Sequence, residues 1–199
     1  QLINNFIHDI VKEAANIVVT GISSSFVIMA QTMEPDNFKK IILVNPSDIN
    51  IFKEMPTKET KAAKTILEIP ILGTFIYNLM HHKRIRNYIE SKYFFKKTFL
   101  SSKLEDTYFE SAHKGNSAGK YLLASTKGNY VNIDITNAVK KADNLYIISS
   151  RERNNAVAII EKYLHLNKNI EATYISNSRY LPQLETPDKF KDIVLMFLQ

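Results

Sequence analysis

The chain has 199 residues, of which 45% are hydrophobic, and its formal net charge at pH 7 is +6. This size and composition are typical of a globular protein with a sizeable core, and no apolar stretch approaches the length needed to cross a bilayer. The absence of cysteine excludes disulfides, thiolate metal sites and a cysteine nucleophile. Because Lys and Arg are spread along the chain without a basic-aromatic motif, we expect a solvated surface and no nucleic-acid partner.

The N-terminal part of the chain alternates helical and strand patterns. Apolar residues from Leu2 to Ala15 recur at helical spacing. The run Ile17 to Thr20 is β-branched and ends at Gly21, which predicts a buried parallel strand. A helix is expected from Ser23 to about Met33, followed by a second buried strand from Lys40 to Val44.

Two further strand-helix pairs are predicted near the C-terminus. A strand over 145–149 precedes a helix over 154–164, and a strand over 170–176 precedes a helix over 187–198. Strands that alternate with helices indicate a parallel sheet. We therefore expect an α/β fold with three layers, α/β/α.

Residues 50 to 140 break this alternation, because they carry helical patterns and many aromatic residues. An insertion of this size after one strand of a parallel sheet predicts a cap over the strand ends, where ligand clefts form. We expect a core domain of residues 1–48 and 138–199 and a helical cap insertion of residues 49–137.

The segment Thr20 to Ser25 lies between a predicted strand and a predicted helix, which is the context of a nucleophile elbow. In that interpretation Ser23 takes a strained turn conformation, and small residues two places away, Gly21 and Ser25, let helix and strand approach. The alternative is an ordinary strand-to-helix turn in which Ser23 or Ser24 is the helix N-cap.

The surrounding sequence resembles capped α/β-hydrolase-fold proteins of the esterase and lipase-like kind. Residues 17–25 look like the elbow strand and turn of that family, and 39–46 look like the following strand. Residues 178–190 resemble its terminal signature, in which Gly-His-Leu-Pro precedes Glu-x-Pro-x-x-Phe, and 108–130 resemble the cap of a bacterial and plant subgroup. The resemblance implies strands five to eight of the family's sheet.

The resemblance implies that Ser23 is the nucleophile position and that the Ser24 amide is an oxyanion donor. It also places Tyr180 at the position of the family's catalytic histidine, with Arg179 in place of a glycine. A serine needs a base that accepts its proton, and a tyrosine with a pKa of about 10 is seldom ionised at neutral pH. We therefore expect a broken triad.

The position of the catalytic acid is altered as well. Where the resemblance implies a carboxylate, the chain has Arg151 or Arg153, and Glu152 is the one acidic side chain between them. Arginine cannot accept a proton. Asp48, after the second strand, is another candidate acid, for which a turn or helix N-cap role is the competing interpretation.

Five histidines offer substitutes for the base. His113 in the insertion could swing over the cleft, although a hydrogen-bonded structural role there is the alternative. His165 is expected on the surface at a helix end, and the others, His8, His81 and His82, look solvent-facing. Their spacing matches no metal site, and we predict neither a metal nor a cofactor.

The resemblance also implies a missing neighbour for the strand Ile17 to Val19 and a missing loop that would donate the second oxyanion amide. We therefore expect the chain to be a portion of a longer protein, and we expect a cytoplasmic location.

Together these features predict a hydrolase-fold protein with weak or absent conventional hydrolysis, which binds a small, partly apolar, acyl-type ligand under the cap. The rival from another class is a non-catalytic binding or interaction protein that uses the same pocket. A third interpretation is peripheral contact with a membrane surface through residues 69–86, where an apolar run leads into the basic residues 81–84. Packing of a cap helix onto the core is the competing explanation for that run.

Overall fold

The computed structural model describes residues 1–81, 85–96 and 99–199, and the side chains of 80, 81 and 85 are left out of the description. The chain forms two compact units: Gln1–Phe52 together with Ile133–Gln199, and Lys53–Asn132. Most of the predicted basic run that follows the apolar segment at 69–80 lies outside the described residues.

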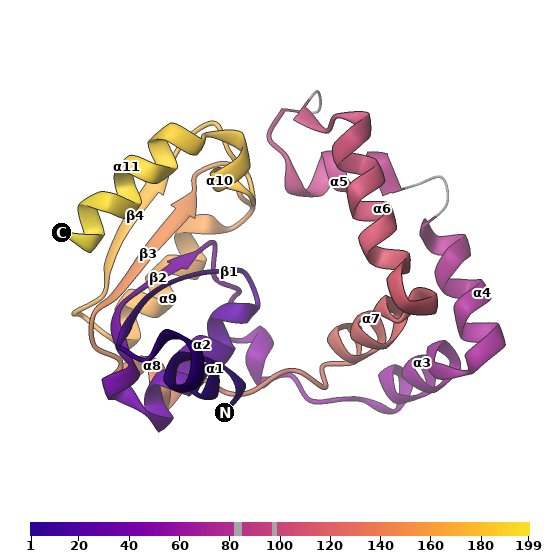
Figure 1. The fold of residues 1–199 in the computed structure, drawn as a ribbon, viewed down its shortest axis with the longest axis horizontal. Helices are drawn as coiled ribbons and strands as arrows, with labels where there is room; N and C mark the ends of the chain where they lie inside the picture. The colour runs from indigo at the N-terminus through magenta and orange to yellow at the C-terminus, as the bar shows by residue number, and fades with distance from the viewer. Residues whose placement is uncertain (82–84, 97–98) are drawn as a thin grey trace. The chain divides into compact units, whose positions relative to one another are not determined.

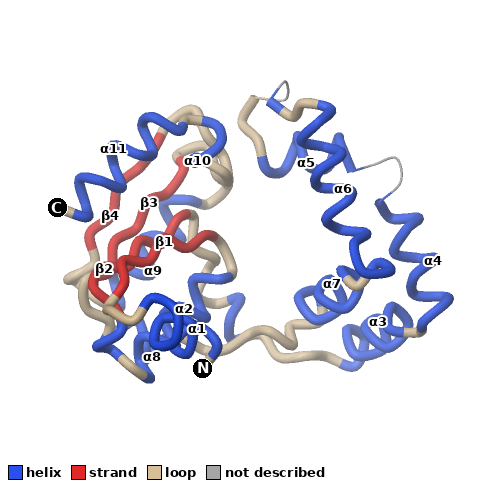
Figure 2. Tube along the Cα trace, viewed as in Figure 1, coloured by secondary structure: helices blue, strands red, loops and turns tan. Residues whose placement is uncertain are grey.

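The first unit is built on a four-stranded parallel sheet in the order β1-β2-β3-β4. The strands are β1 (Ala15–Thr20), β2 (Phe38–Val44), β3 (Leu145–Ser150) and β4 (Glu171–Ile175). Each lies within two residues of its expected bounds. The expectation that β1 is buried is wrong, because its residues alternate between half-buried and exposed, with Val18 44% exposed. Because all four strands run the same way, their C-terminal ends meet at one edge of the sheet, whose strands are arrows in Figure 1 and red in Figure 2.

The helices of this unit follow the strands, as the alternating pattern predicts. They are α1 (Leu2–Phe6), α2 (Ser23–Met33), α8 (Thr136–Lys141), α9 (Ala156–Leu166), α10 (Pro182–Glu185) and α11 (Pro187–Leu198). Short turns of other helix types are η1 (Ile7–Val11), η2 (Pro35–Asn37) and η3 (Ile51–Lys53).

The first helix differs from its prediction. Instead of one helix from Leu2 to Ala15, α1 widens into the π-helical turn η1, which ends at Lys12 with φ of +62°. A π turn bonds each residue to the fifth one before it, so it rotates the side chains that follow relative to an α-helix. Of the expected apolar face, Ile7 is buried, whereas Ile10 is 66% exposed.

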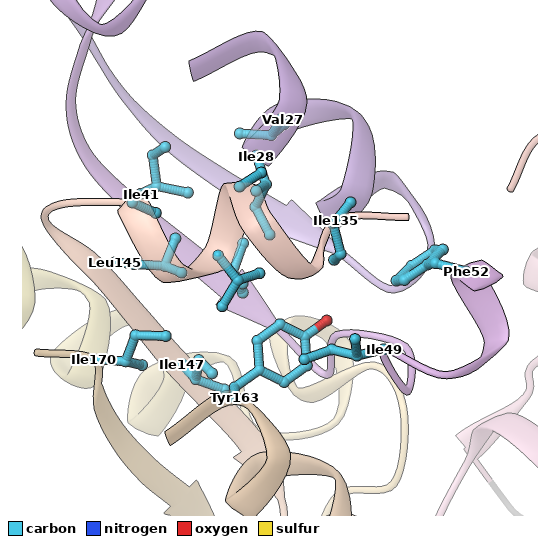
Figure 3. Packing of buried hydrophobic residues seen from close by; sticks show 14 of the residues in the cluster. Val27, Ile28, Ile41, Ile49, Phe52, Ile135, Leu145, Ile147, Tyr163 and Ile170 are labelled. Carbon is cyan, nitrogen blue, oxygen red and sulfur yellow. The ribbon is translucent and has the colours of Figure 1, made fainter. Parts of the chain in front are cut away.

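Side chains of the central strands alternate between two buried faces. On one face, Ile41 of β2 and Ile147 of β3 pack with residues of α2, α8 and α9 such as Ile28 and Tyr163 (Figure 3). On the other face, Ile42, Val44, Ile148 and Ile175 pack against Phe197 of α11. The expected three-layer α/β/α architecture is therefore confirmed.

The insertion is a few residues shorter at both ends than expected, because its boundaries with the core lie inside the range 49–137. Ile49 and Phe52 before it, and Ile135 after it, are buried in the same apolar cluster as the sheet (Figure 3). These side chains place the second unit at Lys53–Asn132 rather than at residues 49–137.

The second unit is helical, as its sequence pattern predicts. It contains α3 (Lys58–Glu68), α4 (Pro70–His81), α5 (Ile85–Tyr93), α6 (Ser102–Ser117) and α7 (Gly119–Lys127). The buried Lys120 ammonium of α7 donates to the carbonyl oxygens of Ile69 and Pro70 and to Thr74 Oγ1, which ties α7 to the start of α4. No helix in the described ranges is long and apolar enough to cross a bilayer.

Replacement of Phe197 by alanine should lower the free energy of unfolding by about 3 to 5 kcal/mol, because it leaves a cavity beneath α11. The ring is 7% exposed, and its centroid lies 4.6 Å from that of Tyr146. Urea unfolding followed by circular dichroism measures this loss. The matched variant Met196→Ala removes a side chain that is 58% exposed on the same helix, and it should change stability by no more than about 0.5 kcal/mol.

Candidate functional site

The bend between β1 and α2 is made by a glycine. Gly21 has φ of +59°, and its N–H donates to the Val44 carbonyl of the neighbouring strand at 3.0 Å. A Cβ at this position would meet nothing within 4 Å, so the backbone conformation rather than space favours glycine. The expectation that Ser23 takes the strained conformation is wrong: Ser23 is the first residue of α2 and is not among the residues with positive φ.

The serines after the bend make local hydrogen bonds. Ser24 Oγ donates to the Gly21 carbonyl at 2.7 Å, and Ser25 Oγ donates to the Ile22 carbonyl at 2.9 Å. The Ser24 N–H, which was the expected oxyanion donor, also donates to the Gly21 carbonyl, at 3.2 Å. Ser23 is exposed, and within the first unit no hydrogen bond joins its hydroxyl to a histidine.

Asn45 joins the ends of β2 and β3 to the loop after β4. It follows β2 with φ of +48° and is 2% exposed. Its Nδ2 donates to Ser150 Oγ at 3.0 Å and to the Tyr180 carbonyl at 3.1 Å, while its Oδ1 accepts from the Ser150 N–H at 2.8 Å. In the sequence, Asn45 is the residue directly after the predicted strand that ends at Val44. An asparagine directly after a buried strand was the available signal, because asparagine tolerates positive φ.

Glu152 serves the same loop. Its Oε1 accepts from the Asn177 N–H at 2.9 Å, and its Oε2 accepts from the Ser178 N–H at 3.4 Å. The buried hydroxyls of Ser150 and Ser178 bond to each other at 2.8 Å. The carboxylate that was expected as a candidate acid therefore holds the turn after β4 in place.

Asp48 lies beyond β2 in a turn. Its Oδ2 accepts from Lys162 Nζ at 2.6 Å, and its Oδ1 accepts from the Asn50 N–H at 2.9 Å. Burial alone would raise the pKa of Asp48, but the hydrogen bonds from Lys162 and Asn50 and the charges of Lys162 and Arg153 outweigh it, so the pKa is lowered. The bond to its own backbone two residues on is the turn role that competed with the acid role.

Arg153 and Tyr180 lie together at this edge of the sheet. Arg153 follows β3 and is 8% exposed, and its guanidinium carbon lies 5.3 Å from the centroid of the half-buried Tyr180 ring. Burial lowers the pKa of Arg153, and the Tyr180 side chain offsets part of that effect. Arg151, the other arginine considered for this position, is exposed.

The histidines with described side chains lie on three different helical elements, η1, α6 and α9. His113 belongs to the second unit, where its Nδ1 lies 2.7 Å from the Phe109 carbonyl and its ring stacks on Phe109. His165, in the last turn of α9, is exposed, and so is His8, which pairs with Asp9. Within the described part of the chain, no group of three or more histidine and acidic residues is placed to hold a metal ion.

No protein-family model and no curated protein matches this sequence. Solved structures do. An α/β-hydrolase enzyme from a Medee basin deep-sea metagenome library is 17% identical, with a TM-score of 0.66 over 99% of this chain and 69% of that one. A thermophilic esterase from Thermogutta terrifontis is 11% identical, with a TM-score of 0.66 over the same shares of the two chains.

A third structure, the 2-hydroxy-6-oxo-6-phenylhexa-2,4-dienoate hydrolase of Rhodococcus sp. strain RHA1, is 13% identical, with a TM-score of 0.65. It is matched over 94% of this chain and 64% of its own length, so the chain spans about two thirds of the proteins that it is similar to.

Replacement of Asn45 by alanine should lower the free energy of unfolding by about 3 to 5 kcal/mol, through the lost hydrogen bonds and the cost of positive φ at a residue with a Cβ. Thermal unfolding measures the effect. Asn144→Ala is the matched control, because Asn144 also has positive φ but is exposed, and it should lose only about 1 kcal/mol. Equal losses in the two variants would contradict a special role for the Asn45 side chain.

The lowered pKa of Asp48 predicts a pH-dependent contribution to stability. Since the folded pKa lies below the unfolded value of about 3.9, the contribution is complete above that value and is lost as the pH falls through the folded pKa. Asp48→Asn should therefore be less stable than the wild type at pH 7 by up to about 1 kcal/mol, and the two should converge in strong acid. Thermal unfolding from pH 7 down to pH 2 tests this, with the exposed Asp143→Asn as a control that shows no such convergence.

The parallel order of the four strands, the helices on both faces and the match of nearly the whole chain to solved hydrolase structures lead to one conclusion: this chain has the α/β-hydrolase fold.

Proposed function

We propose that this chain is a hydrolase-fold protein of serine esterase ancestry in which conventional ester hydrolysis is weak or absent. In this proposal the C-terminal edge of the sheet binds a small, partly apolar ligand of acyl type. The observation that carries it is made at Ser23: within the unit that holds the sheet, the exposed Ser23 hydroxyl forms no hydrogen bond with a histidine.

The conformation of the bend supports the proposal. A nucleophile elbow holds its serine in a strained conformation that lifts the hydroxyl above the strand ends. Here the residue with positive φ is Gly21, which has no hydroxyl, while Ser23 has already entered the helix. A hydroxyl on the first helical turn lacks the placement that a nucleophile elbow gives its serine.

The side chains after β3 and β4 support it as well. In a triad the acid orients a neutral imidazole and stabilises the imidazolium that forms during the reaction. Arg153 beside Tyr180 supplies a fixed positive charge instead, which would disfavour any second cation there. The charge of this edge therefore suits binding of an anionic or polarised group better than proton transfer.

A fluorophosphonate probe, which reacts with activated serines, should leave the full chain unlabelled. Tyr180→His should not restore labelling, because the substitution adds an imidazole but leaves Ser23 in the helix after the bend. Intact-mass measurement after incubation reads out both variants, with a labelled serine esterase as the positive control. Wild-type labelling that disappears in Ser23→Ala would contradict the proposal and establish a working nucleophile.

The rival function, a non-catalytic interaction protein, also predicts that the probe leaves the chain unlabelled. Ligand binding distinguishes the two functions. A small-molecule site at the strand ends predicts saturable thermal stabilisation by a short acyl compound. A protein that acts only by binding other macromolecules predicts none.

A further inference from the structure

Arg153 carries buried hydrogen-bond donors that the protein leaves unused. Its Nε and Nη1 are inaccessible to solvent and have no hydrogen-bond partner among the described residues. The whole residue is only 8% exposed. A buried guanidinium stays charged, because its proton is held too tightly to be released at neutral pH. An unpaired buried cation is costly, so the position calls for an anion.

Two carboxylates near Arg153, those of Asp48 and Glu152, are already hydrogen-bonded to other groups. Asp48, whose charge acts on Arg153, accepts from Lys162 and from the Asn50 N–H, and it forms no ion pair with Arg153 within 4.0 Å in the described structure. Glu152 accepts from the two backbone N–H groups of the turn after β4. Neither acid is placed to neutralise the guanidinium.

Arg153 lacks an ion pair of its own. Lys162 already pairs with Asp48, and no carboxylate lies within 4.0 Å of the Arg153 guanidinium among the described residues. The neighbouring Tyr163 hydroxyl is buried and donates to the Ser47 carbonyl, and burial raises its pKa, so it stays neutral. An anion bound at Arg153 would therefore supply the ion pair that the guanidinium lacks.

We propose that Arg153 binds the carboxylate of a small carboxylic acid at the C-terminal edge of the sheet. A carboxylate is a monoanion at neutral pH, and its oxygens accept well from guanidinium nitrogens. The Tyr180 ring covers one face of the guanidinium and offers an apolar surface to the body of the acid. Because Nε and Nη1 are covered, the side chains over them must shift as the acid enters.

This inference rests on the proposed function and sharpens its ligand from an acyl compound in general to a free carboxylic acid. The position supports it independently, because ligands of open parallel α/β sheets bind at the carboxyl ends of the strands. Arg153 lies three residues after such an end, that of β3.

The test compares butyrate with butyramide, which has nearly the same shape and no charge, by calorimetric titration of the full chain. Butyrate should bind at least ten times more tightly than butyramide. In Arg153→Met, whose side chain has similar length and no charge, the preference for butyrate should disappear. Arg151→Met removes the exposed arginine two residues away, and this variant should still prefer butyrate to butyramide. Circular dichroism verifies that each variant is folded.

Thermal unfolding without ligand gives a second readout. If Arg153 is there to bind an anion, Arg153→Met should be at least as stable as the wild type, since it removes an unpaired buried charge. A clear fall in melting temperature in Arg153→Met but not in Arg151→Met would mean that Arg153 is structural, and would overturn the inference.

Equal binding of butyrate and butyramide by the wild type would overturn it too, whether or not the variants fold. An unchanged preference for butyrate in Arg153→Met would also overturn the inference. These outcomes leave the proposed loss of hydrolysis standing, because that loss is decided by probe labelling at Ser23.

Discussion

The site depends on the hydrogen bonds of one buried side chain, Asn45. The loops after β3 and β4 have no regular structure to fix them, yet they carry Arg153 and Tyr180. Asn45 binds the Ser150 backbone and hydroxyl with one end and the Tyr180 carbonyl with the other. Since a buried amide left unpaired is costly, these bonds fix where the loop after β4 can lie. The Ser150–Ser178 bond and the Glu152 carboxylate fix it further.

The same edge shows how a local backbone choice limits chemistry. A strand that turns sharply into a helix needs one residue with an unusual conformation, and here a glycine takes it. The cost of strain is thereby avoided at Gly21, but the residue at the bend then carries no hydroxyl. Ser23 and Ser24 follow inside ordinary helical geometry, where Ser24 satisfies the Gly21 carbonyl.

Much of the fold was predictable from the sequence, because the two central strands are largely buried and are rich in apolar, mainly β-branched residues. The run from Ile41 to Val44 is an example: all four residues have 0% exposure. The π turn after Phe6 was not predictable, since its apolar spacing is also that of an α-helix. The joins of the insertion were missed because Phe52 and Ile135 pack through tertiary contacts that no local pattern records.

The site was predictable in its residues and not in its geometry. Sequence alone pointed to Tyr180, Arg153, Glu152 and Asp48, and the structure brings Arg153 against Tyr180. It could not give the direction of each side chain, so two carboxylates that looked like candidate acids proved to be bonded within turns. Nor could it separate Gly21 from Ser23 as the residue of the bend, because that difference is one of backbone dihedral angle.

What remains at the strand ends is a fixed charge rather than a proton relay. A histidine and a carboxylate can pass a proton because each has a pKa that the reaction can cross. Arginine stays protonated at physiological pH, so Arg153 can hold a charge but cannot take up a proton from a nucleophile. Burial strengthens this contrast, since it increases both the cost of the unpaired guanidinium and the attraction of an anion to it. The physical chemistry of this edge therefore favours recognition over turnover.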